Sequence, residues 1–69
     1  MLGAREAEVL ELRWVDVHGV AYADIVLRFA DGVVAPTRIG RESIPADLEV
    51  GERVMVSEAM NVVVQIRRS

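Results

Sequence analysis

The sequence predicts an all-β domain, a five-stranded small barrel of the OB-like kind, with an SH3-like barrel as the alternative. Valine, which favours strands, occurs thirteen times in the 69 residues. Apolar and polar residues alternate in short segments that end at glycine, at proline or at Asp-Gly. Closure into a barrel removes exposed strand edges, which suits so short a β chain. We therefore expect a single domain over residues 1–69, with a short helical plug between the third and fourth strands.

The first strand is expected over residues 7–18. Its apolar residues change parity: Leu10, Leu12 and Trp14 share one face, and Val15 and Val17 share the other. A long strand with a β-bulge near residues 13–15 has this pattern, because it faces two parts of a barrel in turn. The opening residues 5–11 are also compatible with the start of a helix, since Glu and Ala favour helices.

The second strand, over residues 20–29, has the clearest alternation in the chain. Its odd-numbered residues from Ile25 to Phe29 are apolar and are expected to point inward. The following Asp31-Gly32 pair is typical of a tight hairpin turn. Pro36 lies in the third strand, residues 33–39, and cannot donate a hydrogen bond to a neighbouring strand. The third strand is therefore expected to lie at an edge or to carry a bulge.

The next segment is expected to form the plug. Ser43 is predicted to cap a short helical turn that has Pro45 near its start. Ile44 and Leu48 are spaced to lie on one face of that turn and to fill one end of the barrel.

The last two strands are expected over residues 53–57 and 62–67. Val54 and Val56 are predicted to point inward in the first of them. In the second, even-numbered residues are predicted to point inward and odd-numbered ones, including Val63, outward.

Part of the chain is similar to a known family. Residues 48–56, LEVGERVMV, and residues 59–66, AMNVVVQI, resemble the end of the hydrogenase-maturation chaperones of the HypC/HupF kind. The order of segments from Ile25 to Ile66 also follows that family. The resemblance implies an OB-like barrel and a habit of binding other proteins. The family relies on a Cys directly after the initiator Met, where this chain has Leu2, so its metal-delivery function is not implied.

Composition narrows the possible functions. The chain has no Cys and one His, so we expect no metal site and no cofactor. Its net charge is -3 and it has three aromatic residues, which disfavours nucleic acid as a partner. No apolar run is long enough to span a membrane, and the expected location is the cytoplasm.

The predicted function is a non-enzymatic protein-interaction or assembly module, and the alternative is a nucleic-acid-binding barrel. The apolar fraction is 52% and the mean hydropathy is +0.28, high values for so small a domain, which favours a homo-oligomer or another protein partner. Trp14 is interpreted mainly as a core residue and otherwise as an anchor on a partner. The predicted partner-binding residues are Trp14, Val26, Met55 and Val63.

Other polar residues suggest weaker hypotheses. An arginine set on or near the second and third strands is proposed to contact an anion or nucleic acid; it comprises Arg28, Arg38 and Arg41. The nucleic-acid alternative expects Trp14, Tyr22 and two of these arginines on one face. Asp16 and His18 could set a general base, but no nucleophile is close in sequence, so we predict no enzyme activity and no catalytic residues.

Overall fold

The computed structural model of the protein describes residues 2–69 and consists of five antiparallel strands in one open sheet, with a 3-10 turn after the third strand. The elements are β1 (Leu2–Val17), β2 (Val20–Phe29), β3 (Val34–Gly40), η1 (Arg41–Ser43), β4 (Arg53–Ala59) and β5 (Val62–Arg68). The strand order is β3-β2-β1-β4-β5. β3 and β5 touch each other, but between residues 2 and 69 no strand pairing joins them, so the predicted barrel closure is not observed.

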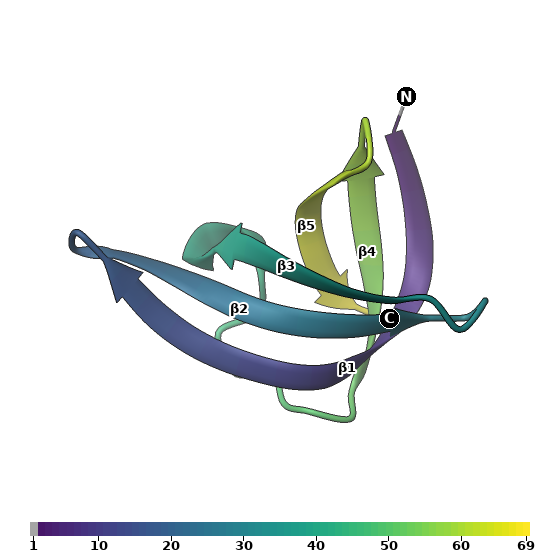
Figure 1. Ribbon diagram of the computed structural model, residues 1–69, viewed down its shortest axis with the longest axis horizontal. Coiled ribbons are helices and arrows are strands. Elements are labelled where there is room, and N and C mark those ends of the chain that lie inside the picture. Colours follow the sequence, from purple (N-terminus) through teal and green to yellow (C-terminus); the bar gives the residue numbers. More distant parts are fainter. Residues whose placement is uncertain (1) are drawn as a thin grey trace.

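β1 belongs to both halves of the sheet. Residues 2–8 pair with β4 and residues 7–17 pair with β2, so the strand curves from one half to the other (Figure 1). The β-bulge lies between Val9 and Glu11, not near residues 13–15 as predicted. The bulge lies directly after the residues of β1 that pair with β4. A bulge lets a strand bend, so β1 can turn away from β4 at this point. β1 also begins five residues earlier than predicted. Residues 5–11, which were also compatible with the start of a helix, belong to this strand.

β2 and β3 agree well with the prediction. β2 has the predicted bounds, and its residues from Ala23 to Phe29 alternate between buried and more exposed. β3 is shifted by one residue and pairs only with β2, so Pro36 does lie in an edge strand. We call the side of the sheet that carries the buried residues the inner face and the opposite side the outer face.

The core is small and covers the inner face. All its members are less than a tenth exposed; they are Ala7, Val9, Ala23, Ile25, Leu27, Phe29, Ile39, Ile44, Leu48, Val54, Val56 and Ile66. Trp14 lies on the inner face opposite Ala23, but it is 41% exposed. The prediction that Trp14 is a core residue is therefore wrong, because β1 and β2 extend beyond the part of the sheet that β4 and β5 cover.

The plug is present, but its helical turn is displaced. Ile44 and Leu48 are both buried in the core, as predicted. Ser43 ends the 3-10 turn instead of capping one, and Gly40 occupies the N-cap position without a side-chain hydrogen bond. Ile44 returns to an extended conformation because the following Pro45 disfavours helical geometry there.

β5 departs from the predicted alternation at its start. A bulge opposite Ser57 and Glu58 leaves Val64 as an extra residue in β5. Val63 therefore packs against the core, and the prediction that it points outward is wrong. Val62 and Val64 are exposed, against the prediction that they point inward, whereas Ile66 beyond the bulge is buried as expected.

Among residues 2–69 there is no helix of the length and apolar character needed to cross a membrane.

Candidate functional site

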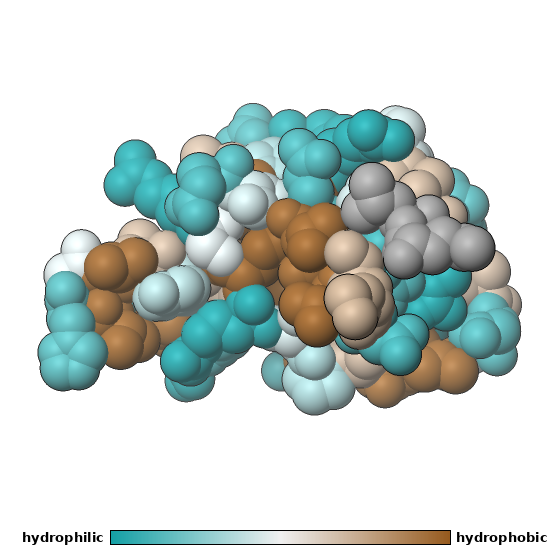
Figure 2. Space-filling view, turned by 90° about the horizontal axis from the view of Figure 1, so that it is seen from above, coloured by the Kyte–Doolittle hydropathy of each residue, from teal (hydrophilic) through white to brown (hydrophobic). Residues whose placement is uncertain are grey.

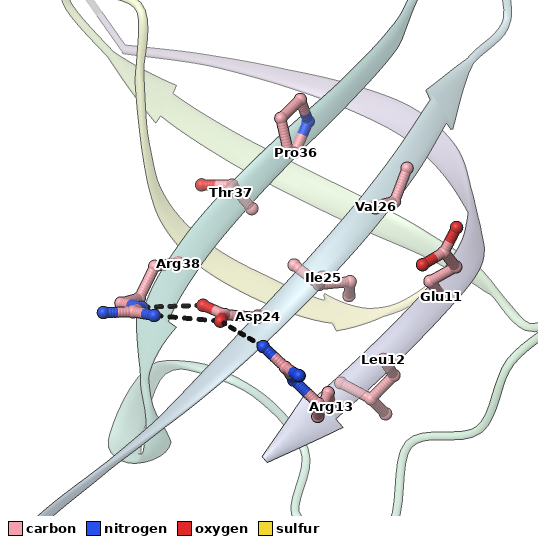
Figure 3. Close-up of a pocket in the computed structure, with 9 residues that line it drawn as sticks. All are labelled: Glu11, Leu12, Arg13, Asp24, Ile25, Val26, Pro36, Thr37 and Arg38. Atoms are coloured by element: carbon pink, nitrogen blue, oxygen red, sulfur yellow. Dashed lines mark hydrogen bonds and ion pairs between the residues drawn. The ribbon is translucent and has the colours of Figure 1, made fainter. Parts of the chain in front are cut away.

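A shallow groove crosses the outer face of β1, β2 and β3 (Figure 3). Val26 and Pro36 form apolar parts of its floor, opposite each other on β2 and β3. Asp24 and Arg38 lie at one end, where Arg38 Nε and Nη2 donate to the two Asp24 carboxylate oxygens at 2.7 and 2.9 Å. Arg13 Nη2 approaches the same carboxylate at 3.7 Å. The polar groups at this end of the groove therefore satisfy one another.

The hydrogen bond from Arg38 determines the electrostatics of this groove. It lowers the pKa of the Asp24 carboxyl, and the charge of Arg13 adds to the effect. The same hydrogen bond raises the pKa of Arg38. Asp24 is therefore a carboxylate at neutral pH, and its charge neutralises that of Arg38, which was predicted to contact an anion.

The other predicted anion contacts do not join Arg38 in one site. Arg28 forms an ion pair with Glu8, which faces it across β1 and β2. Arg41 lies in η1 and is exposed. Trp14 is on the inner face, whereas Tyr22 lies on the outer face with Arg28 and Arg38, so the cluster expected for nucleic-acid binding is not formed.

The β1–β2 turn is shaped by the predicted Asp16–His18 pair. An Asp16 carboxylate oxygen accepts the Gly19 N–H at 2.9 Å. His18 is exposed and has a φ of 52°, in the left-handed region. Asp16 therefore stabilises the tight turn between β1 and β2 by its hydrogen bond to Gly19, and His18 is one of the turn residues.

Apolar side chains are exposed along the same end of the hairpin. Val17 and Val20 face each other across the strands and are 36% and 50% exposed. Figure 2 shows apolar surface at this end of the molecule, on the left. Trp14 adds a partly exposed ring on the inner face.

Replacing Trp14 by alanine is expected to lower the free energy of unfolding by about 1 kcal/mol, well below the ~3–5 kcal/mol of a fully buried ring. The reason is that much of the ring is already in contact with water. Urea unfolding followed by circular dichroism measures this loss. A loss as large as that of a core aromatic residue would contradict the placement of Trp14 at the open end of the inner face.

A second groove lies between the unpaired edges of β3 and β5, and we call it the β3–β5 groove. It is lined by Arg5, Leu27, Phe29, Val33, Ala35, Pro36, Thr37, Glu58, Asn61, Val62 and Val63. Arg5 lies over the Phe29 ring, with its guanidinium carbon 3.9 Å from the ring centre. Arg5 Nε also donates to Glu58 at 2.8 Å, and this bond raises the pKa of Arg5. The charged groups of this groove are thus paired, and the rest of its lining is mostly apolar.

The four predicted partner-binding residues lie in different places. Val26 is on the floor of the outer groove and Val63 lines the β3–β5 groove. Met55 is on the outer face of β4, opposite Glu6, and Trp14 is at the hairpin end. The structure does not bring these four side chains into one patch.

Sequence reasoning missed the apolar residues around the β3–β5 groove. Two exposed large hydrophobic residues, Val33 and Val62, line this groove, and the exposed Met60 directly precedes Asn61, which also lines it. Met60 offered a clue, because a two-residue hairpin turn favours Asn, Asp or Gly at that position.

An ion-pair cluster joins the end of β5 to the loop before β4. Arg68 contacts the carboxylates of Glu52 and Asp47, each at 2.9 Å. The hydrogen bonds from Arg68 lower the pKa of both carboxyls. A carboxyl whose pKa is lower in the folded chain than in the unfolded chain stabilises the folded chain at pH values above its unfolded pKa. This stabilisation is lost as the pH falls through the pKa of the folded chain.

Acid is therefore expected to destabilise the protein, beginning near the usual carboxyl pKa of ~4 and continuing below it. Urea unfolding at a series of pH values measures the effect. Arg68→Gln should flatten the dependence, because it removes the partner of both carboxylates. Arg67→Gln, on the opposite face of β5, is the matched control. Equal pH dependence in Arg68→Gln and the unmodified protein would contradict this role for the cluster.

In the part of the chain that the structure describes, no group of three or more His, Cys, Asp or Glu side chains is placed to hold a metal ion. Comparison of the chain with known protein families, with curated proteins and with solved structures found no match.

Proposed function

We propose that this protein is a non-enzymatic interaction module that associates with copies of itself. The observation that carries the proposal is the amount of exposed apolar surface. Among residues 3–69, whose side chains the structure describes, nine large hydrophobic residues are exposed, against twelve hydrophobic residues in the core. Trp14, Val17 and Val20 lie at the β1–β2 hairpin end, and Val33 and Val62 line the β3–β5 groove. Monomeric proteins rarely expose large contiguous apolar patches, and such patches are typical of protein-binding surfaces.

The small core supports the same proposal. A domain below about 70–80 residues rarely obtains more than ~3–5 kcal/mol from its own core and often gains stability from a partner. Burial of the exposed valines and of Met60 against another chain would supply part of that stability.

We also propose that the sheet is an OB-like barrel with a loose junction between β3 and β5. β1 pairs with both β2 and β4, and the helical turn lies between β3 and β4. Contact between β3 and β5 gives further support. The strand order and the position of the turn favour an OB-like over an SH3-like arrangement.

The charges favour a protein over a nucleic acid as the partner. Arg13, Arg28 and Arg38 on the outer face have Glu8 and Asp24 as ion-pair partners. A nucleic acid would need these arginines free to neutralise phosphates.

The mass in solution, measured by size-exclusion chromatography with light scattering at low and high salt, tests the proposal. An oligomer at both salt concentrations is expected, because apolar contacts are not weakened by screening. A monomer at every accessible protein concentration would refute self-association.

A further inference from the structure

The turn between β2 and β3 presents an Asp-Gly sequence at the surface. Asp31 and Gly32 are both exposed, and the turn lies at the opposite end of β2 from the β1–β2 turn (Figure 1). Gly32 has a φ of 88°. Apart from its chain neighbours, no atom of residues 2–69 lies within 4 Å of the place where a Cβ atom of Gly32 would be. The Gly32 nitrogen is therefore shielded neither by a side chain of its own nor by a neighbouring strand.

The Asp31 side chain is held toward the peptide bonds that follow it. One of its carboxylate oxygens accepts the Val33 N–H at 3.0 Å, two residues further along the chain. This hydrogen bond folds the side chain forward, to the side of the Gly32 nitrogen. Attack of that nitrogen on the Asp31 carboxyl carbon would close a five-membered ring, and groups held close to each other within one molecule react much faster than free groups.

We propose that Asp31 is a site of spontaneous isoaspartate formation in the folded protein. The Gly32 nitrogen attacks the carboxyl carbon of the neutral side chain, and the N–H proton and the carboxyl hydroxyl leave together as one water molecule. The product is a cyclic imide. A second water molecule opens the ring: addition at the side-chain carbonyl restores aspartate, whereas addition at the main-chain carbonyl gives isoaspartate, in which the chain continues through the side chain. One water is lost and one is gained, so the modified protein is an isomer of the original.

The hydrogen bonds of the turn set the conditions for this reaction. The Gly32 N–H donates to the Phe29 carbonyl oxygen at 2.9 Å, and this bond must open before the nitrogen can attack. The turn is exposed and leads into β3, an edge strand that pairs only with β2. Exposed turns of this kind open locally at a small cost in free energy. The reaction therefore proceeds from the locally opened turn, without unfolding of the core.

The other aspartates of the chain are poor sites for the same chemistry. They occur in the pairs Asp16-Val17, Asp24-Ile25 and Asp47-Leu48. The branched side chain of the following residue crowds the nitrogen that would have to attack. The Asp47 side chain is 82% exposed, so exposure alone does not distinguish it from Asp31. Asp47 is therefore an internal control.

Incubation of the full protein in mildly acidic and in neutral buffer, followed by peptide mapping that separates aspartyl from isoaspartyl peptides, tests the proposal. Isoaspartate should accumulate at Asp31 at least ~10-fold faster than at Asp47. Equal rates at the two positions, or no isoaspartate at Asp31 in either buffer, would overturn the proposal. Urea well below the unfolding midpoint should leave the rate nearly unchanged, whereas a rate that rises steeply with the unfolded fraction would refute reaction in the folded protein.

Two variants test the roles of the reacting groups. Gly32→Asn should keep the turn, because asparagine tolerates a positive φ, while its side chain crowds the nitrogen. Isoaspartate formation at Asp31 should then be at least ~10-fold slower. Asp31→Glu keeps the carboxyl group but would have to close a larger ring, so it should give no branched product. An unchanged rate in Gly32→Asn, with circular dichroism showing a folded chain, would overturn the proposal.

Discussion

Replacing Leu27 by alanine is expected to remove most of the stability of the protein. Leu27 lies in the middle of β2 with no exposed surface, in the core shared by all parts of the sheet. Truncation of a buried leucine costs about 2–5 kcal/mol, because apolar contacts are lost and a cavity is left. A core of this size supplies only ~3–5 kcal/mol in total. Urea unfolding followed by circular dichroism should therefore show a strongly lowered midpoint or a largely unfolded chain in buffer.

Val26→Ala is the matched control for Leu27→Ala. Val26 is the preceding residue of β2 and its side chain is on the outer face, only partly buried. Its truncation should cost about 1 kcal/mol or less. Similar losses in the two variants would contradict the assignment of inner and outer faces in β2.

The accuracy of the β2 prediction has a local cause. β2 lies between β1 and β3, and its side chains from Ala23 to Phe29 alternate without a bulge. A strand with one buried face reveals its register in its own sequence. The predicted Asp31-Gly32 turn is confirmed for a similar reason: Gly32 has a φ of 88°, and an Asp31 carboxylate oxygen accepts the Val33 N–H at 3.0 Å.

The bulges could not be placed from the sequence alone. Both arise where a strand bends in response to a partner distant in the chain: β1 where it leaves β4, and β5 opposite the end of β4. A bulge moves all following side chains to the other face. The predicted orientations of Val62, Val63 and Val64 were therefore wrong, whereas Ile66, beyond the bulge, was predicted correctly.

The candidate site was predicted less well than the fold. The sequence indicated that apolar residues would be exposed, but it gave no means of choosing which ones. Exposure of Trp14 depends on how far the β1–β2 hairpin extends past β4, and that is a property of the whole sheet. The pairing of Arg38 with Asp24 likewise depends on cross-strand register, which brings residues 14 positions apart to face each other.

Leu48→Ala is expected to destabilise both halves of the sheet together, by about 2–5 kcal/mol. Leu48 is a buried member of the core in the segment between η1 and β4, and η1 itself contacts both β2 and β5. Because β3 and β5 are not paired, this plug supplies a connection between the two halves that strand pairing does not.

The fluorescence of Trp14, the only tryptophan, reports on the β1–β2 half, and circular dichroism reports on all strands. The two signals should change at the same lowered urea concentration, whereas Val50→Ala, in the same loop but 59% exposed, should change stability by ~0.5 kcal/mol or less. Separate transitions for the two signals would mean that the halves are held together by β1 alone and that the plug only fills space.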